Sequence, residues 1–180
     1  MINKFFNNKV SIVPVDQLAG PIYFGWSSSP FGRCFILLQS DNVVGLGFKN
    51  GRPEHQIEAS MKTHWLNNNS KFEPLNTDKI AESIFFKNIP INISFHGSQL
   101  QVTVWKALLE IPLGKTVAYS DIAKKTGNSN AIRAVATAIG KNPIAWLVPC
   151  HRIIRKSGAL GGYRWGLKIK NMMLSNETKL

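Results

Sequence analysis

The stretch SDIAKKTGNSNAIRAVATAIGK, residues 120–141, decides the fold of the second half of this chain. Ser120 is a favourable N-cap and predicts a first helix over residues 121–125. Residues 126–130 are a short turn that contains glycine. The small and apolar residues that follow predict a second helix over residues 131–141. This spacing is typical of a helix-turn-helix unit, and an ordinary pair of core helices is the alternative.

The second of these helices carries few bulky side chains on the face that bears Ala134 and Ala138. A helix with such a face is able to approach the groove of a nucleic acid closely. Before the unit, apolar residues at helical spacing predict another helix over residues 98–109, which a turn containing proline and glycine closes at residues 111–115. The second half of the chain therefore reads as helices.

Toward the N-terminus the pattern changes to short β-rich runs separated by turn residues. Three runs predict an antiparallel hairpin or meander, at residues 21–26, 33–39 and 42–48. Two helices and one more strand are predicted after them, at residues 54–66, 77–87 and 91–95. The boundary is placed near His96 and Gly97, where the charge balance also changes. We therefore expect an α+β protein with a small α/β domain over residues 1–95 and a second domain over residues 96–180.

The composition is that of a globular protein, with 44% apolar and 18% charged residues in a chain of 180. Cys34 and Cys150 are too few for a disulfide framework or an all-thiolate zinc site. No apolar run is long enough to span a membrane, and the polar residues 1–9 lack the apolar core of a signal peptide. These features predict a cytoplasmic protein with no membrane association.

Positive charge is concentrated in the second half. The net charge is +12; residues 1–95 carry nine Lys/Arg against seven Asp/Glu, and residues 96–180 carry thirteen against three. A domain with this excess attracts phosphate backbones through counterion release. Nucleic acid is therefore the expected partner, and a basic surface that merely keeps the protein soluble is the alternative.

The most chemically informative motif is Pro149-Cys150-His151-Arg152. A thiol is nucleophilic as its anion, and a neighbouring His or Arg lowers the pKa of the thiol toward the working pH. The motif therefore predicts a reactive thiolate at Cys150, with a buried inert cysteine as the alternative.

Two longer patterns extend this motif. The first runs from Asn142-Pro143 through LVPCHRII, residues 147–154, to SGALGGYRWGL, residues 157–167, and Lys170. The second comprises Gln101, Val104-Trp105, Leu108, Ile111-Pro112, Gly114, Thr116, Tyr119, Ile122-Ala123 and Arg133-Ala134-Val135. Together they resemble the O6-alkylguanine-DNA alkyltransferases over residues 97–177, whereas the N-terminal half matches only loosely.

The resemblance implies a DNA repair protein that flips O6-alkylguanine, chiefly O6-methylguanine, out of duplex DNA and transfers the alkyl group irreversibly to Cys150, once per molecule. Tyr119 would donate a proton to N3 of the base, and His151 would accept the thiol proton through a water molecule. Glu177 would orient the imidazole, and Asn142 would tie the second helix to the cysteine turn. The alternatives are that Tyr119 only packs in a core, that Glu177 is a frayed terminal charge and that Asn142 is a plain helix C-cap.

The family pattern lays the second helix of the unit in the minor groove, with Arg133 filling the gap left by the flipped base. Further candidates for DNA contact are Tyr119, Ala134, Ala138, Lys124, Lys125, Lys141 and Arg155. The candidates for the base pocket are Val148, Pro149, Ile153, Tyr163, Arg164 and Trp165. The bulk of Trp165, where some relatives have a small residue, is expected to restrict the pocket to methyl and other small groups.

By the same resemblance the first domain is a ribonuclease H-like structural domain and the second is winged-helix-like. We expect a monomer with no cofactor and no metal, because Cys34, His55 and His64 lack the spacing of a zinc site. Two other function classes remain open. One is a helix-turn-helix module that binds alkylated bases without reacting; the other is a Cys-His hydrolase, for which the basic half has no explanation. The sequence leaves open whether O4-methylthymine is repaired.

Overall fold

The computed structural model describes residues 10–63, 65, 71–87 and 89–178. Backbone contacts divide the chain into two compact units, residues 1–96 and 97–180. His64 and residues 66–70, which include the predicted end of the first N-terminal helix, lie outside the described residues, as do residues 1–9.

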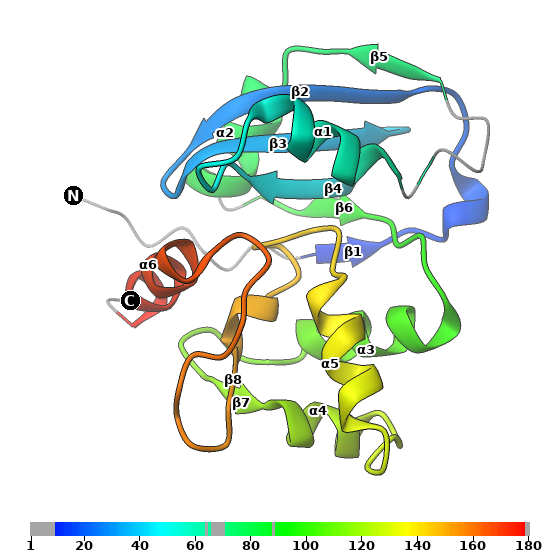
Figure 1. Cartoon of the computed structure of the whole chain (residues 1–180). Coiled ribbons are helices and arrows are strands. Elements are labelled where there is room, and N and C mark those ends of the chain that lie inside the picture. The colour runs from blue at the N-terminus through cyan, green and yellow to red at the C-terminus, as the bar shows by residue number, and fades with distance from the viewer. Residues whose placement is uncertain (1–9, 64, 66–70, 88, 179–180) are drawn as a thin grey trace. The chain divides into compact units, whose positions relative to one another are not determined.

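A six-stranded sheet forms the described part of the first unit, in the order β1-β6-β4-β3-β2-β5 (Figure 1). Its strands are β1 Val10–Ile12, β2 Ile22–Ser29, β3 Gly32–Gln39, β4 Asn42–Phe48, β5 Phe72–Pro74 and β6 Ile91–Ile93. The antiparallel pairing of β2 with β3 and of β3 with β4 confirms the predicted meander. Strands β1, β5 and β6 enter the sheet through parallel pairing, which short runs in a single sequence do not reveal.

Two helices accompany this sheet, α1 Glu54–Lys62 and α2 Asp78–Phe86, and a 3-10 turn lies at Val15–Gln17. Helix α1 buries Ile57 and Met61, and α2 buries Ala81, Ile84 and Phe85. Strand β4 is buried along its whole length rather than at alternate residues. Both of its faces are therefore covered, as expected for a central strand.

The second unit contains α3 Gln99–Leu109, α4 Tyr119–Lys125 and α5 Ile132–Gly140 (Figure 1). Helix α3 begins with a capping box between Ser98 and Gln101. Nε1 of Trp105 donates to the carbonyl oxygen of Ala138 at 2.8 Å, which ties α3 to α5. The two helices predicted over residues 121–141 are therefore present.

The predicted start of the first of them is wrong. Helix α4 begins at Tyr119, and Ser120 makes no capping hydrogen bond. The cap comes instead from Asp121, whose Oδ2 accepts from the backbone nitrogen of Ala118 at 2.9 Å. A carboxylate at the third helical position reaches back to the start of the helix in the same way as in a capping box.

Three further elements complete the second unit. Strand β7 Val117–Ala118 pairs in parallel with β8 Ile153–Ile154, and the 3-10 turn η3 Cys150–Arg152 directly precedes β8. Tyr119 follows β7 directly, so this pairing brings Tyr119 toward the turn that starts at Cys150. The last helix, α6 Leu167–Glu177, was not predicted because its buried stripe includes Lys170 and Glu177 as well as Ile169 and Met173.

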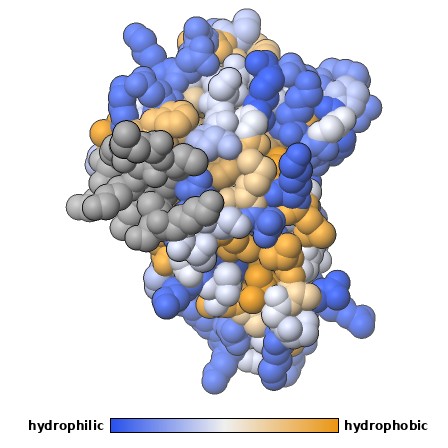
Figure 2. Space-filling model, turned by 90° about the vertical axis from the view of Figure 1, so that its left-hand side faces the viewer, coloured by the Kyte–Doolittle hydropathy of each residue, from blue (hydrophilic) through white to orange (hydrophobic). Residues whose placement is uncertain are grey.

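No helix within the described residues is long and apolar enough to cross a membrane. Figure 2 shows the molecule from the side on which α6 lies in Figure 1, with hydrophobic residues visible among hydrophilic ones. Large apolar side chains that stay more than a third exposed are Ile12, Val15, Leu75, Phe86, Ile89, Ile132, Leu167 and Met172.

Candidate active site around Cys150

Cys150 is the first residue of η3, and its side chain is buried. The chain reaches it through a tight path, in which the backbone nitrogen of Val148 donates to the carbonyl of Ile144 at 3.0 Å and that of Cys150 donates to the carbonyl of Val148 at 2.8 Å. Pro149 is the central residue of the second of these turns and restricts its backbone. The thiol is thus held by local backbone geometry.

Asn142 fixes the same segment from the end of α5. Its Nδ2 donates to the carbonyl of Val148 at 2.9 Å and to Sγ of Cys150 at 3.1 Å, and its Oδ1 accepts from the backbone nitrogen of Ile144 at 3.0 Å. The backbone donor at Ile144 identifies which side-chain atom is the oxygen. Asn142 is therefore a buried link from α5 to the thiol rather than a plain helix cap.

Burial raises the pKa of the Cys150 thiol. The hydrogen bond from Asn142, the charge of Lys170 and the Tyr163 hydroxyl act in the opposite direction and favour the thiolate. The sequence-based expectation that the adjacent His151 and Arg152 lower this pKa is wrong, because both side chains are directed to Glu177. A neutral thiol needs a base to accept its proton before it can attack.

His151 has the geometry of such a base. Its ring is fully buried, and its Nε2 lies 2.8 Å from Oε1 of Glu177. Burial lowers the pKa of His151, so the ring is neutral near pH 7. The ionised carboxylate only accepts, hence Nε2 carries the proton and Nδ1 keeps a free lone pair. Nδ1 has no hydrogen-bond partner among the described residues, which leaves it open to accept a proton.

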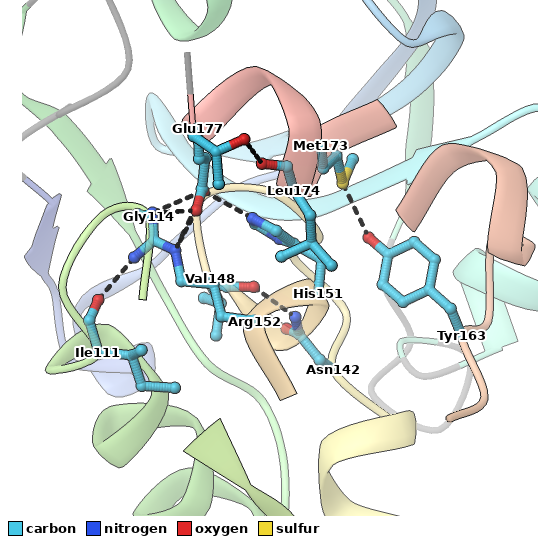
Figure 3. Close-up of polar contacts among 11 residues, drawn as sticks. Ile111, Gly114, Asn142, Val148, His151, Arg152, Tyr163, Met173, Leu174 and Glu177 are labelled. Carbon is cyan, nitrogen blue, oxygen red and sulfur yellow. Dashed lines mark hydrogen bonds and ion pairs between the residues drawn. The ribbon is translucent and has the colours of Figure 1, made fainter. Parts of the chain in front are cut away.

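The carboxylate of Glu177 accepts hydrogen bonds from His151, Arg152 and Gly114 (Figure 3). Nε and Nη2 of Arg152 donate to the carboxylate at 2.8–3.0 Å, and the backbone nitrogen of Gly114 donates to Oε2 at 3.2 Å. Nη1 of Arg152 donates to the carbonyl of Ile111 at 2.6 Å. Although burial opposes it, hydrogen bonds from His151 and Arg152 lower the pKa of Glu177 to about 2. Glu177 is only 3% exposed, so the alternative of a frayed terminal charge is wrong.

A pocket of about 560 Å³ opens beside the thiol. Its lining brings together residues that are far apart in sequence: Tyr119, Ile132, Arg133, Ala136, Ile139, Gly140, Asn142, Cys150, Arg155, Gly161, Gly162, Tyr163, Arg164 and Trp165. Cys150 therefore faces a space large enough for a ligand. His151 is not part of this lining, and its ring is fully buried.

Tyr119 reaches the pocket from the first turn of α4 and is half-buried. Burial and the neighbouring Cys150 raise the pKa of its hydroxyl, although Arg155 opposes the shift. The group therefore keeps its proton at neutral pH. Gly161, which has φ +68°, leaves room for it, because a Cβ there would lie 3.1 Å from the Tyr119 oxygen. Tyr119 therefore lines the pocket together with Cys150, whereas the alternative considered from sequence was that it only packs in a core.

Three predicted pocket residues and one predicted DNA-contact residue need correction. Val148, Pro149 and Ile153 do not line the pocket, and the side chains of Val148 and Ile153 are fully buried. They support the backbone on either side of the thiol instead. Ala138 is 3% exposed on the face of α5 that packs on α3. Ala134 is exposed and remains available for close approach.

The predicted basic residues lie at the surface. Arg133 and Arg155 are exposed and also line the pocket, while Lys124 and Lys141 are exposed away from it. Lys125 forms an exposed ion pair with Glu110 at 2.7 Å. Two further predicted residues, Arg164 and Trp165, stack at the pocket, with the guanidinium carbon 4.9 Å from the centre of the Trp165 ring.

Sequence reasoning gave no role to Lys170. Its Nζ donates to the carbonyl of Ile153 at 2.6 Å and to those of Leu160 and Gly162, which fastens the pocket loop to α6. Burial lowers the pKa of Lys170 to about 8. The available sequence signal for a buried lysine was its place between the apolar residues Ile169 and Met173. Tyr163, on the same loop, donates to Sδ of Met173 at 3.3 Å (Figure 3).

The described residues hold no cluster of three or more His, Cys, Asp or Glu that could bind a metal. Burial raises the pKa of the other cysteine, Cys34, to about 12. Cys34 is therefore an inert thiol at neutral pH. His64, considered as a zinc ligand from sequence, lies outside the described residues.

Residues 99–179 match the family model described as 6-O-methylguanine DNA methyltransferase, DNA binding domain. A methylated-DNA–protein-cysteine methyltransferase of Methanosarcina acetivorans is 35% identical over 159 residues, which cover 87% of this chain and 98% of that protein. An inducible protein of the same name from Bacillus subtilis is 47% identical over 93 residues, 52% of each chain. The crystal structure of Mycobacterium tuberculosis OGT in complex with DNA superposes with a TM-score of 0.69 at 29% identity, covering 87% of this chain and 93% of that one. The chain therefore belongs to the O6-alkylguanine-DNA alkyltransferases, the family of the methylated-DNA–protein-cysteine methyltransferases.

Proposed function

We propose that this protein repairs DNA by transferring an alkyl group from O6 of guanine to its own Cys150, once per molecule. The observation that carries the proposal is a buried thiol that faces a pocket of about 560 Å³ and is followed by a His151–Glu177 pair. The names of the relatives and the DNA complex of the M. tuberculosis protein support the same reaction.

The reaction begins with the thiol proton. Because burial keeps Cys150 neutral, Nδ1 of His151 accepts the proton through a water molecule, and Glu177 stabilises the imidazolium that forms. The sulfur then attacks the alkyl carbon. The new S–C bond forms as the C–O6 bond breaks, and the electron pair of that bond goes to the guanine.

Guanine leaves more easily if its ring is protonated as the bond breaks. The Tyr119 hydroxyl, which lines the same pocket as Cys150 and stays protonated at neutral pH, donates to N3 of the base. Tyr119 regains a proton from solvent, and the imidazolium of His151 loses one. The net change is a thiol converted to a thioether and an alkylguanine converted to guanine, so one protein molecule is consumed for each base.

The base must leave the stack to reach Cys150, because the thiol lies inside the pocket. Arg133 lies at the first turn of α5 and lines the pocket, so it is placed to fill the gap in a duplex whose minor groove receives α5. Phosphate contacts come from the exposed cations Lys124, Lys125, Lys141 and Arg155.

The stacked Arg164 and Trp165 restrict the pocket. Trp165 is 1% exposed and therefore has little freedom to move aside for a bulky alkyl group. On this argument methyl groups on O6 of guanine are the preferred substrate, and repair of O4-methylthymine stays open.

The two units divide the work. Residues 1–95 form a ribonuclease H-like structural domain, and residues 96–180 form a helix-turn-helix domain of the winged-helix type that binds DNA and accepts the alkyl group. All of the reacting groups come from one chain, so the protein acts as a monomer. A free thiol acceptor requires a reducing compartment, in keeping with the cytoplasm.

The test is the mass of the intact protein after incubation with duplex DNA that contains O6-methylguanine. One added methyl per chain, located by peptide mapping on Cys150, is expected. Cys150→Ser should gain no methyl and keep its affinity for DNA, while Cys34→Ser should react normally. Methyl on Cys34, or repeated turnover by one protein molecule, would refute the proposal.

A further inference from the structure

Trp146 contacts His151, the residue proposed to accept the thiol proton. Its indole is stacked on the imidazole of His151, with ring centres 5.3 Å apart and ring planes 13° from parallel. Trp146 is 6% exposed and His151 is fully buried, so little solvent reaches this stack. Neither the motif around Cys150 nor the residues proposed for the reaction include Trp146.

The backbone at Trp146 is unusual. In the described part of residues 97–180, Trp146 is the one non-glycine residue with a positive φ, at +70°. This left-handed conformation is strained for a bulky L-residue. Two short hydrogen-bonded turns enclose it, from Leu147 to Ala145 at 2.9 Å and from Val148 to Ile144 at 3.0 Å. The backbone of Trp146 is therefore strained, and the same residue carries the indole that stacks on the imidazole of His151.

Most of the surroundings of His151 disfavour its protonated form, the imidazolium. The charged groups that face it are Glu177, which favours the imidazolium, and Arg152 and Lys170, which oppose it. Burial opposes it as well. An aromatic face stacked on the ring attracts a cation and is worth more where water is excluded. It also blocks rotation of the imidazole about its bond to Cβ.

We infer that Trp146 is a positioning residue for His151, holding the imidazole so that Nε2 faces Glu177 while Nδ1 takes the thiol proton, and stabilising the imidazolium through its aromatic face. The inference rests on the proposed function, because His151 must act as the base for Cys150. It predicts that changing the aromatic ring alters the proton chemistry of Cys150 and does not merely loosen the fold.

The experiment measures the rate at which iodoacetamide alkylates Cys150 between pH 5 and pH 10, by peptide mass. This reagent needs no DNA, so the result does not depend on methyl transfer. Trp146→Leu removes the aromatic face and should lower the rate at pH 7 by about ten-fold, and should move the acid limb of the profile to lower pH. Trp146→Phe keeps a stacked ring and should stay within about three-fold of the original protein. Trp26→Phe, which alters an indole in the first unit, is the matched control and should change nothing.

A second readout keeps the inference testable if Trp146→Leu fails to fold. Protonation of an imidazole stacked on an indole quenches the emission of the indole. The difference in fluorescence between the original protein and Trp146→Phe should therefore titrate over the same pH range as the acid limb. A pH-independent difference, or an unchanged rate profile in folded Trp146→Leu, would overturn the inference. Failure of methyl transfer from DNA with these effects intact would instead reject the proposed function alone.

Discussion

Nε2 of His151 and Oε1 of Glu177 lie 2.8 Å apart although 26 residues separate them in the chain. Both side chains are buried, and Arg152 binds the same carboxylate. The last residue of α6 therefore sets the orientation of the residue next to Cys150. Docking of this helix and the orientation of the His151 imidazole therefore share one carboxylate.

Glu177→Gln tests that dependence. The amide keeps the size of the side chain but leaves the largely buried guanidinium of Arg152 without an anion, so the free energy of unfolding should fall by roughly 3 kcal/mol. Methyl transfer should also slow. The matched control is Glu110→Gln, which breaks the exposed pair with Lys125 and should cost less than about 1 kcal/mol. Equal losses in the two variants, measured by denaturant titration, would contradict the role given to Glu177.

Acid should weaken the fold through the same residue. The pKa of Glu177 is about 2 in the folded protein and 4.5 for an ordinary glutamate. The carboxylate therefore contributes roughly 3 kcal/mol above about pH 4.5, and this contribution is lost as the pH falls toward 2. The stability difference between the original protein and Glu177→Gln should shrink over that range. A difference that stays constant from pH 7 to pH 3 would show that the charge of Glu177 is unimportant.

Tyr119→Phe removes the proposed proton donor and keeps the ring at the pocket wall. Methyl transfer from duplex DNA should slow by roughly a hundred-fold in single-turnover measurements, while DNA affinity changes little. Phe86→Leu, at an exposed apolar residue of α2, is a control that should leave the rate unchanged. An unaltered rate in Tyr119→Phe would assign Tyr119 to packing.

Arg133→Ala should separate base flipping from chemistry. Repair of duplex DNA should slow far more than reaction with the free O6-methylguanine base, because only the duplex has a gap to fill. Both rates are measured as methyl gained by Cys150. Equal losses on the two substrates would place Arg133 in the chemical step or in folding rather than in the duplex.

Salt dependence should locate the DNA-binding face. Affinity for undamaged duplex should fall linearly with salt on a log-log plot, with a slope near −0.9 for each neutralised phosphate. Lys124→Ala should reduce the magnitude of the slope by about 0.9, and Lys125→Ala by less, because Glu110 already offsets that charge. Lys71→Ala and Lys79→Ala in the first unit are controls and should leave the slope unchanged. An equal effect of the controls would move the binding face away from α4 and α5.

Much of the fold could be predicted from local patterns. Alternating and continuous apolar runs were enough for β2, β3 and β4, because neighbouring antiparallel strands need only a short turn between them. Helical spacing located α2, α3 and α5. Strands β1, β5, β7 and β8 were not predicted, because each has only two or three residues and is defined by pairing with a distant segment. Strand β6 is equally short, and it lies within the predicted strand over residues 91–95.

The sequence by itself determined the order of the chemical groups: Cys150, the adjacent His151, and Tyr119, Asn142 and Glu177 at the spacings of the family. The tertiary structure alone decided what each group does to the others. It turned Arg152 toward Glu177 rather than the thiol, buried Ala138 and Val148, and stacked Trp146 on His151. The physical reason is that a pKa, a pocket wall and a stacked ring depend on groups brought together from distant segments, and no local spacing records which of those groups meet.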